Sequence, residues 1–225
     1  MKNSENKKIP ALLFAGMVVI FIASCNNKQG NGDTKTDTTT VSNMNKDTMN
    51  NHSVNDGSNL MGSMSSMMVK MKAVQMTSDF DIDFATLMIQ HHQGAVDMSQ
   101  QELNTGQDVK MKEMAQRIID MQTKDIADLR TFISSYKPSG MKHGEGELQQ
   151  SISEMDSKMK TMMMSGDFDK DFAAMMMQHH KDGVAMAKKE LSNGMSDKLK
   201  KMAQAHITSA EKDITAFQNW LSGTK

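Results

Sequence analysis

Apolar residues in the middle of the chain recur at helical intervals. The clearest stripe has steps of four, seven and three residues and consists of Phe84, Met88, Ala95 and Met98. Such steps place side chains on one face of an α-helix. We therefore predict a helix from about residue 79 to 104, ending near Gly106, and a second helix from about residue 107 to 134, with their apolar faces turned to a shared core.

The whole pattern returns 88 residues later without a gap. Matching segments include Asp79-Phe80-Asp81 with Asp167-Phe168-Asp169, and Lys124-Asp125-Ile126 with Lys212-Asp213-Ile214. A single hairpin of two helices cannot cover its own apolar face, whereas two hairpins can cover each other. We therefore predict an all-α domain over residues 59–225, in which repeat units 61–133 and 149–221 build a four-helix bundle. Methionine-rich segments from Met61 to Met76 and from Met155 to Met164 precede the hairpins and are expected to form short helices.

The first 58 residues have a different pattern. Residues 1–24 combine basic residues with a 13-residue apolar stretch, which is short for a membrane span and typical of a signal peptide. Ile22-Ala23-Ser24-Cys25 resembles the lipobox of bacterial lipoproteins, which implies cleavage before Cys25 and a lipid on its sulfur. A generic signal peptide with a chance cysteine, or an N-terminal anchor, is the alternative. Residues 25–58 are polar and predict a flexible tether.

This N-terminal pattern also predicts a location. We expect a protein of the bacterial cell envelope that faces the periplasm and contacts the membrane through its N-terminal lipid alone. Asn26, rather than an aspartate, follows Cys25, and this favours the outer membrane. The formal net charge of −1 gives no indication of nucleic-acid binding. The sequence does not determine the oligomeric state.

Methionine is the unusual component of the composition, with 27 of 225 residues. Methionine is a good helix former and an adaptable core residue, but this number exceeds what packing needs. The single cysteine excludes a thiolate metal site in the mature domain, so the thioether is the soft ligand that remains. Met67, Met68 and Met71 cluster at helical spacing, and Met141 and His143 form a candidate accessory site in the glycine-rich link. An adaptable packing surface is the alternative for these methionines.

Two His-His pairs carry the clearest chemical signal. Adjacent helical residues diverge by about 100°, so one histidine of each pair can face the core and the other a rim. The duplication is expected to bring both pairs together with methionines of the same helices. Thioethers select Cu(I), and imidazole suits both copper oxidation states. We therefore predict a copper site, with Cu(I) favoured and Cu(II) accessible, built from His91, His92, His179, His180, Met88, Met98, Met176 and Met186. Satisfied core residues are the structural alternative.

Four aspartates are candidates for a supporting role. Asp83 and Asp171 precede the histidines by eight residues, and Asp125 and Asp213 interrupt the apolar stripe of the second helices. Either pair could ligate metal or hold a histidine in one tautomer, although charge at a helix start is the plainer explanation for Asp83. Histidine must be neutral to bind metal, so we expect acid below roughly pH 6 to weaken binding.

These residues resemble the family catalogued as domain of unknown function 305. The resemblance rests on Asp-Phe-Ala-x-x-Met-x-x-His-His at residues 83–92 and 171–180, and covers about residues 61–221. It implies a ferritin-like four-helix bundle, usually exported, with some members that bind copper and are associated with copper resistance. The chain departs from the family at Asp125 and Asp213, where glutamate is usual, and at Leu129 and Phe217, where methionine is usual. His206 and Ala210 replace the residues that match Ile118 and Gln122, so His206 is a candidate additional ligand.

The function that these features favour is non-enzymatic. We expect an exported copper buffer or chaperone in copper tolerance, which could exchange copper with an export or delivery protein. A methionine-rich structural protein or oxidant scavenger, whose thioethers cycle through sulfoxide, is the first alternative. A ferritin-like metal oxidase is less favoured, because that class uses Glu-x-x-His pairs and this sequence contains none.

Overall fold

The computed structural model describes residues 58–138, 144 and 146–223. Cys25, Met141, His143, the signal segment and nearly all of the tether lie outside the described residues. The described chain is all-α, as predicted, with the helices α1 (Ser58–Lys72), α2 (Phe80–Thr105), α3 (Val109–Ser135), α4 (Glu147–Thr161), α5 (Phe168–Asn193) and α6 (Asp197–Gly223). No helix in these ranges combines the length and hydropathy of a membrane span.

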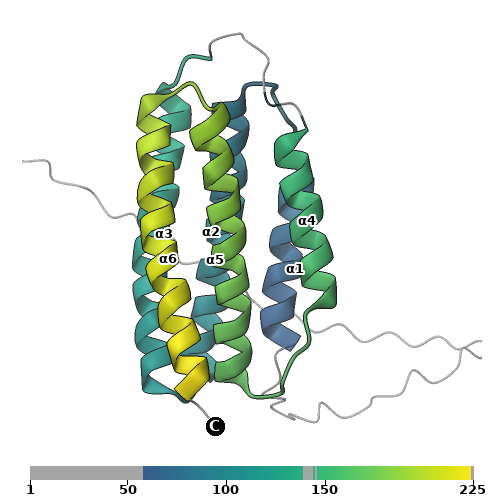
Figure 1. Cartoon of the computed structure of the whole chain (residues 1–225), viewed down its shortest axis with the longest axis vertical. Helices are drawn as coiled ribbons and strands as arrows, with labels where there is room; N and C mark the ends of the chain where they lie inside the picture. The colour runs from purple at the N-terminus through teal and green to yellow at the C-terminus, as the bar shows by residue number, and fades with distance from the viewer. Residues whose placement is uncertain (1–57, 139–143, 145, 224–225) are drawn as a thin grey trace, which may run out of the picture. The chain divides into compact units, whose positions relative to one another are not determined.

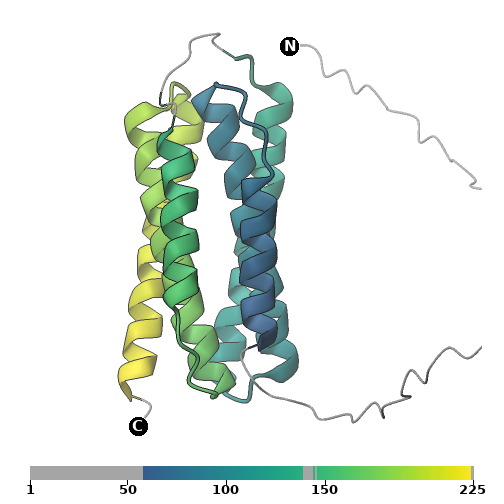
Figure 2. The same ribbon diagram turned by 90° about the vertical axis from the view of Figure 1, so that its right-hand side faces the viewer.

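The six helices form two copies of a three-helix unit. Helices α2 and α5 contact each other at the centre, and each packs along its hairpin partner, α3 or α6. The shorter helices α1 and α4 lie on the other side of the α2–α5 layer (Figures 1 and 2). The prediction of two hairpins preceded by short methionine-rich helices is therefore confirmed. The histidine pairs lie near the middle of the two central helices.

Capping residues explain where the central helices begin and end. The Asp79 carboxylate accepts a hydrogen bond from Ile82 N at 3.1 Å, and Asp167 does the same for Lys170 N. Such side-chain caps satisfy backbone N–H groups that the helix leaves unpaired. At the other end, Glu102 folds so closely over Gly106 that a Cβ atom there would overlap its carboxyl group.

Two aspartates, the buried Asp81 and the partly buried Asp169, join the halves reciprocally. Asp169 of α5 accepts hydrogen bonds from the backbone N–H groups of Gln107 and Asp108, which lead into α3. Asp81 of α2 accepts them from Met195 and Ser196, which lead into α6. Each central helix therefore holds the start of the other half's outer helix. We call these contacts the aspartate clasps.

Methionine fills much of the core. Eleven buried methionines lie among the described residues: Met64, Met67, Met68, Met71, Met88, Met98, Met111, Met155, Met175, Met176 and Met186. Flexible thioether side chains pack well into irregular space. Much of the methionine excess therefore serves packing, and exposed residues such as Met163 are the exception.

Candidate metal centre

Five buried histidines meet where α2, α5 and α6 approach one another. They are His91, His92, His179, His180 and His206, and each is at most 6% exposed. The sequence therefore correctly placed both His-His pairs together, and His206 joins them from the second hairpin. Imidazole is an unusual choice for an apolar core, because each buried ring carries two polar nitrogens that need partners.

His91 and His179 form the centre of this cluster. Their rings are stacked with centroids 3.7 Å apart and planes at 26°. His179 Nε2 donates to the backbone carbonyl of His91 at 2.9 Å, which leaves Nδ1 as the nitrogen with a free lone pair. Neither ring nitrogen of His91 has a hydrogen-bond partner among the described residues. Leaving a buried polar atom unpaired costs about 1–3 kcal/mol, so this arrangement calls for an explanation.

Methionines from the short helices line a cavity beside the stacked pair. His91 and His179 line a cavity of about 10 Å³ together with Met64, Met67, Met68, Met155, Met159, Gln178 and Asp182. We call this the methionine cavity. Its volume is close to the smallest that holds one water molecule. The space therefore suits a single ion without its hydration shell.

His180 is held differently from its neighbours. Its Nε2 lies 3.2 Å from Asp213 Oδ2, and Asp213 also forms an ion pair with Arg117 at 2.7 Å. Burial would raise the pKa of Asp213, but the hydrogen bonds from His180 and Arg117 outweigh it and lower the pKa. An ionised Asp213 fixes the orientation of His180, which is the role that the sequence suggested for this aspartate.

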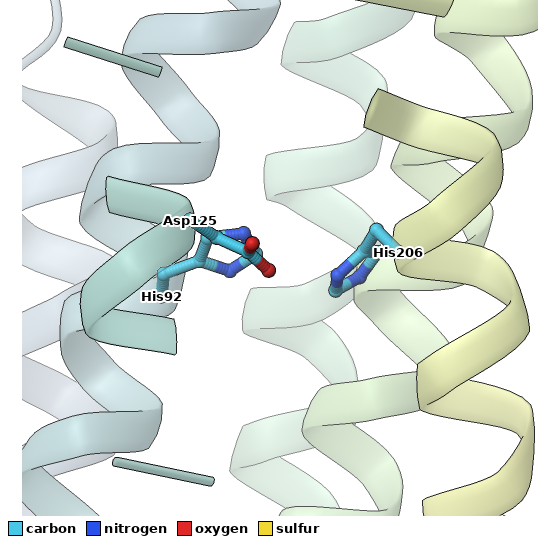
Figure 3. A group of neighbouring side chains, drawn as sticks. All are labelled: His92, Asp125 and His206. Carbon is cyan, nitrogen blue, oxygen red and sulfur yellow. The ribbon is translucent and has the colours of Figure 1, made fainter. Parts of the chain in front are cut away.

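His92 and His206 face a groove on the opposite side of the central layer. Their ring centroids lie 5.0 Å apart, and the Asp125 carboxylate lies beside them (Figure 3). One donor atom from each of the three residues lies within 4.8 Å of the other two. The groove has a volume of about 450 Å³ and runs between α3 and α6. We call this the outer groove.

Gly183 of α5 leaves room for the rings of His91 and His206 to approach the helix backbone. A Cβ atom at this position would lie 2.7 Å from His206 Nε2 and 3.0 Å from His91 Cε1. Both distances are too short for ordinary contact. The absence of a side chain at Gly183 is therefore part of the site's geometry.

Burial keeps four of the histidines neutral: His91, His92, His179 and His206. It lowers the pKa of His91 and His92 well below the usual value, with further lowering by neighbouring histidines. It lowers the pKa of His179 to about 3 and that of His206 to about 4. A neutral ring is the form that binds metal. The expected weakening near pH 6 must therefore be corrected, because these four rings stay ready for metal in more acidic solution.

The other predicted residues lie in several places. Met88 lines the outer groove with His92, while Met98, Met176 and Met186 are fully or almost fully buried in the hydrophobic core and line neither cavity. Asp83 and Asp171 accept hydrogen bonds from Thr77 and Ser165 in the preceding loops. These two carboxylates stabilise helix starts and are not brought to the histidines.

The methionines beside His91 and His179 come from elements that the sequence did not connect to them. Pattern analysis assigned the sulfur ligands to the histidines' own helices, whereas the methionine cavity is lined by methionines of α1 and α4. The helical spacing of Met67, Met68 and Met71 was the available signal. The repeat offset also pairs Met67 with Met155 and Met71 with Met159.

Known proteins with a related sequence or structure complete the description. The family described as Domain of unknown function (DUF305) matches residues 26–133 and 134–221. CopM in the Cu(II)-bound form is 26% identical, with a TM-score of 0.50, and the match covers 64% of this chain and 97% of that one. CopM in the Cu(I)-bound form is 24% identical, with a TM-score of 0.48, and the match covers 66% of this chain and 97% of that one.

A DUF305 fragment from Deinococcus radiodurans is 18% identical, with a TM-score of 0.49, and the match covers 64% of this chain and 95% of the fragment. A comparison with curated proteins found no match.

Proposed function

The chain belongs to the DUF305 family, and from this premise and the geometry of its histidine cluster we propose that it is a copper-binding protein. The observation that carries the proposal is the buried His91–His179 stack, whose unpaired nitrogens share a small cavity with five methionines. The likeness to CopM in its Cu(II)-bound form supports copper as the metal.

The donor set favours Cu(I) in the methionine cavity. Thioethers are soft, uncharged ligands that select Cu(I), and imidazole nitrogen completes such a site. A cavity of about 10 Å³ suits a bare ion with few ligands. Buried imidazole nitrogens without a hydrogen-bond partner destabilise the metal-free form, and a bound ion would give them a partner.

We propose a carrier role without a catalytic step. The chain would hold copper at the bacterial cell envelope, as a buffer or chaperone, and thereby contribute to copper tolerance. A lipid on Cys25 would keep it at the membrane, with the outer membrane favoured, and the domain would face the periplasm. Exchange with a copper-export or delivery protein follows from this role.

Competition titration of the reduced chain with Cu(I) tests the proposal. Met67→Leu combined with Met155→Leu removes one sulfur from each short helix at equivalent repeat positions. Met-to-Leu exchange conserves volume and usually costs less than about 1.5 kcal/mol of stability, so the fold should persist. We expect the dissociation constant for Cu(I) to rise at least tenfold.

Met163→Leu is the matched control, because Met163 is 91% exposed and should not contribute to the site. Equal Cu(I) affinity in the double variant, the control and the unmodified chain would refute the assignment of the methionine cavity. Iron uptake with oxygen consumption would instead favour the oxidase alternative.

A further inference from the structure

The outer groove contains a second donor set of different chemistry. His92 of α2, Asp125 of α3 and His206 of α6 approach from three helices and place their donor atoms within 4.8 Å of one another. Figure 3 shows the three side chains pointing toward a shared space. Nδ1 of His92 and both ring nitrogens of His206 are buried without a hydrogen-bond partner among the described residues.

Two imidazoles and a carboxylate are typical ligands of a borderline divalent ion. Zn²⁺ binds histidine nitrogen at about 2.0–2.1 Å, which separates two ligands of a tetrahedral site by about 3.3 Å. The donors here lie within 4.8 Å of one another, so they would have to approach by at most about 1.5 Å to reach that spacing. Met88, Met121 and Met202 also line the groove, but the carboxylate adds a hard, charged ligand that Cu(I) does not favour.

The two halves of the molecule differ at this point. The repeat equivalents of His92 and Asp125 are His180 and Asp213, which bond to each other, and Asp213 also pairs with Arg117. The equivalent of His206 is Ile118, which is fully buried and apolar. Within the described residues the three-donor arrangement therefore occurs once, and it depends on a histidine that breaks the internal symmetry.

We propose that His92, Asp125 and His206 form a separate site for one divalent ion of the Zn²⁺ and Cu²⁺ class. Three protein ligands leave a fourth position, and the outer groove, about 450 Å³ in volume, gives water or another molecule access to it. The site is chemically distinct from the methionine cavity, although the adjacent residues His91 and His92 place both on one helix.

Zn²⁺ is the probe, because it has no redox chemistry and binds nitrogen and oxygen ligands readily. Isothermal titration of the chain should give one equivalent of bound Zn²⁺. His206→Ile copies the residue at the equivalent position 118, and Asp125→Asn removes the charge with little change in shape. We expect each substitution to weaken Zn²⁺ binding at least tenfold, while Cu(I) affinity stays within twofold for His206→Ile.

Asp128→Asn is the control, because Asp128 lines the same groove but lies outside the donor set. Absence of Zn²⁺ binding, or binding that neither substitution weakens, would overturn the proposal. If His206→Ile does not fold, the Zn²⁺ affinity of Asp125→Asn alone decides the outcome. Loss of Cu(I) affinity with unchanged Zn²⁺ affinity would also overturn it. Failure of the proposed Cu(I) function is read separately, from the methionine substitutions.

Discussion

At the scale of single residues, Gly183 shows how tightly the histidine cluster is packed. We expect Gly183→Ala to displace the rings of His91 and His206, because the new Cβ would lie within 3.0 Å of both. Overpacking of this kind typically destabilises a fold by about 1–3 kcal/mol. Urea denaturation measures the change, and metal titration should show weaker binding.

Gly62→Ala provides the comparison, since nothing lies within 4 Å of a Cβ atom at that position in α1. There the exchange should stabilise the helix by roughly 0.5–1 kcal/mol, because alanine loses less backbone entropy than glycine. Equal stability changes at both positions would mean that Gly183 has no special part in the site.

The neutral histidines predict a dependence of stability on pH. In the folded chain the pKa of His179 is about 3 and that of His206 about 4, against an unfolded value near 6.5. The unfolded state therefore takes up protons first as pH falls through about 6.5. Each such histidine removes up to about 1.4 kcal/mol of stability per pH unit, until the pH reaches its folded pKa.

Glu102 and Glu190 act in the opposite direction. Burial, aided by Asp169 and Asp81 respectively, raises the pKa of each to about 9. The stability that these two carboxyl groups contribute to the fold is fully present below their unfolded pKa of about 4.3, and it is lost as the pH rises toward 9. Between pH 6.5 and 4.5 these two groups partly offset the four histidines, so the loss of stability should become steeper below pH 4.5.

Urea denaturation of the metal-free chain from pH 7 to pH 3.5 measures this profile. His206→Ile should flatten it by removing one titrating group, while Met163→Leu should leave it unchanged. Stability that stays constant or rises across the whole acidic range would contradict the buried, neutral state of the histidines.

At the scale of helices, the aspartate clasps predict how the halves hold together. Asp169→Asn should cost about 1–3 kcal/mol, because it weakens charge-assisted hydrogen bonds to the start of α3. Asp81→Asn should have a similar effect at the start of α6. Chemical denaturation of both variants gives the values.

Asp120→Asn serves as the control, because it removes one negative charge on the exposed side of α3. The hydrogen bond described for Asp120 is only to Gln116. If Asp169→Asn lowers the free energy of unfolding no more than Asp120→Asn does, the aspartate clasp contributes little to stability.

The broken symmetry of the second helices gives a gain-of-function prediction that rests on the inferred Zn²⁺ site. Arg117→Ala with Ile118→His copies Ala205 and His206 into the first half, which frees Asp213 from its ion pair and adds an imidazole beside His180. Titration should then show two equivalents of Zn²⁺ in place of one. Ile118→Ala with Arg117→Ala is the control, and a stoichiometry that remains at one would argue against the three-donor geometry.

The central helices were predictable because their signals are local. The spacing from Phe84 to Met98, the caps at Asp79 and Asp167 and the ends at Gly106 and Gly194 all act within one helix. The repeat offset then predicted that the two His-His pairs would meet. The partners of each histidine were not predictable, because they depend on how α1, α3, α4 and α6 pack, and periodicity does not contain that information.

At the scale of the whole molecule, the central layer separates two kinds of candidate metal ligand. The side covered by α1 and α4 places methionines in one cavity with His91 and His179, while the side between α3 and α6 places a carboxylate near His92 and His206. This separation follows from the His-His pairs, because adjacent residues of a helix point in different directions and the two histidines of a pair therefore face different sides. Sequence reasoning foresaw that divergence but combined both sides into one site.

The most direct test of the account is X-ray absorption at the copper edge of the chain loaded with one equivalent of Cu(I). We predict sulfur and nitrogen scatterers together in the first coordination sphere, and a clear loss of the sulfur component in Met67→Leu with Met155→Leu but not in Met163→Leu. A spectrum with nitrogen and oxygen neighbours alone, or one that the double substitution leaves unchanged, would contradict a copper centre in the methionine cavity.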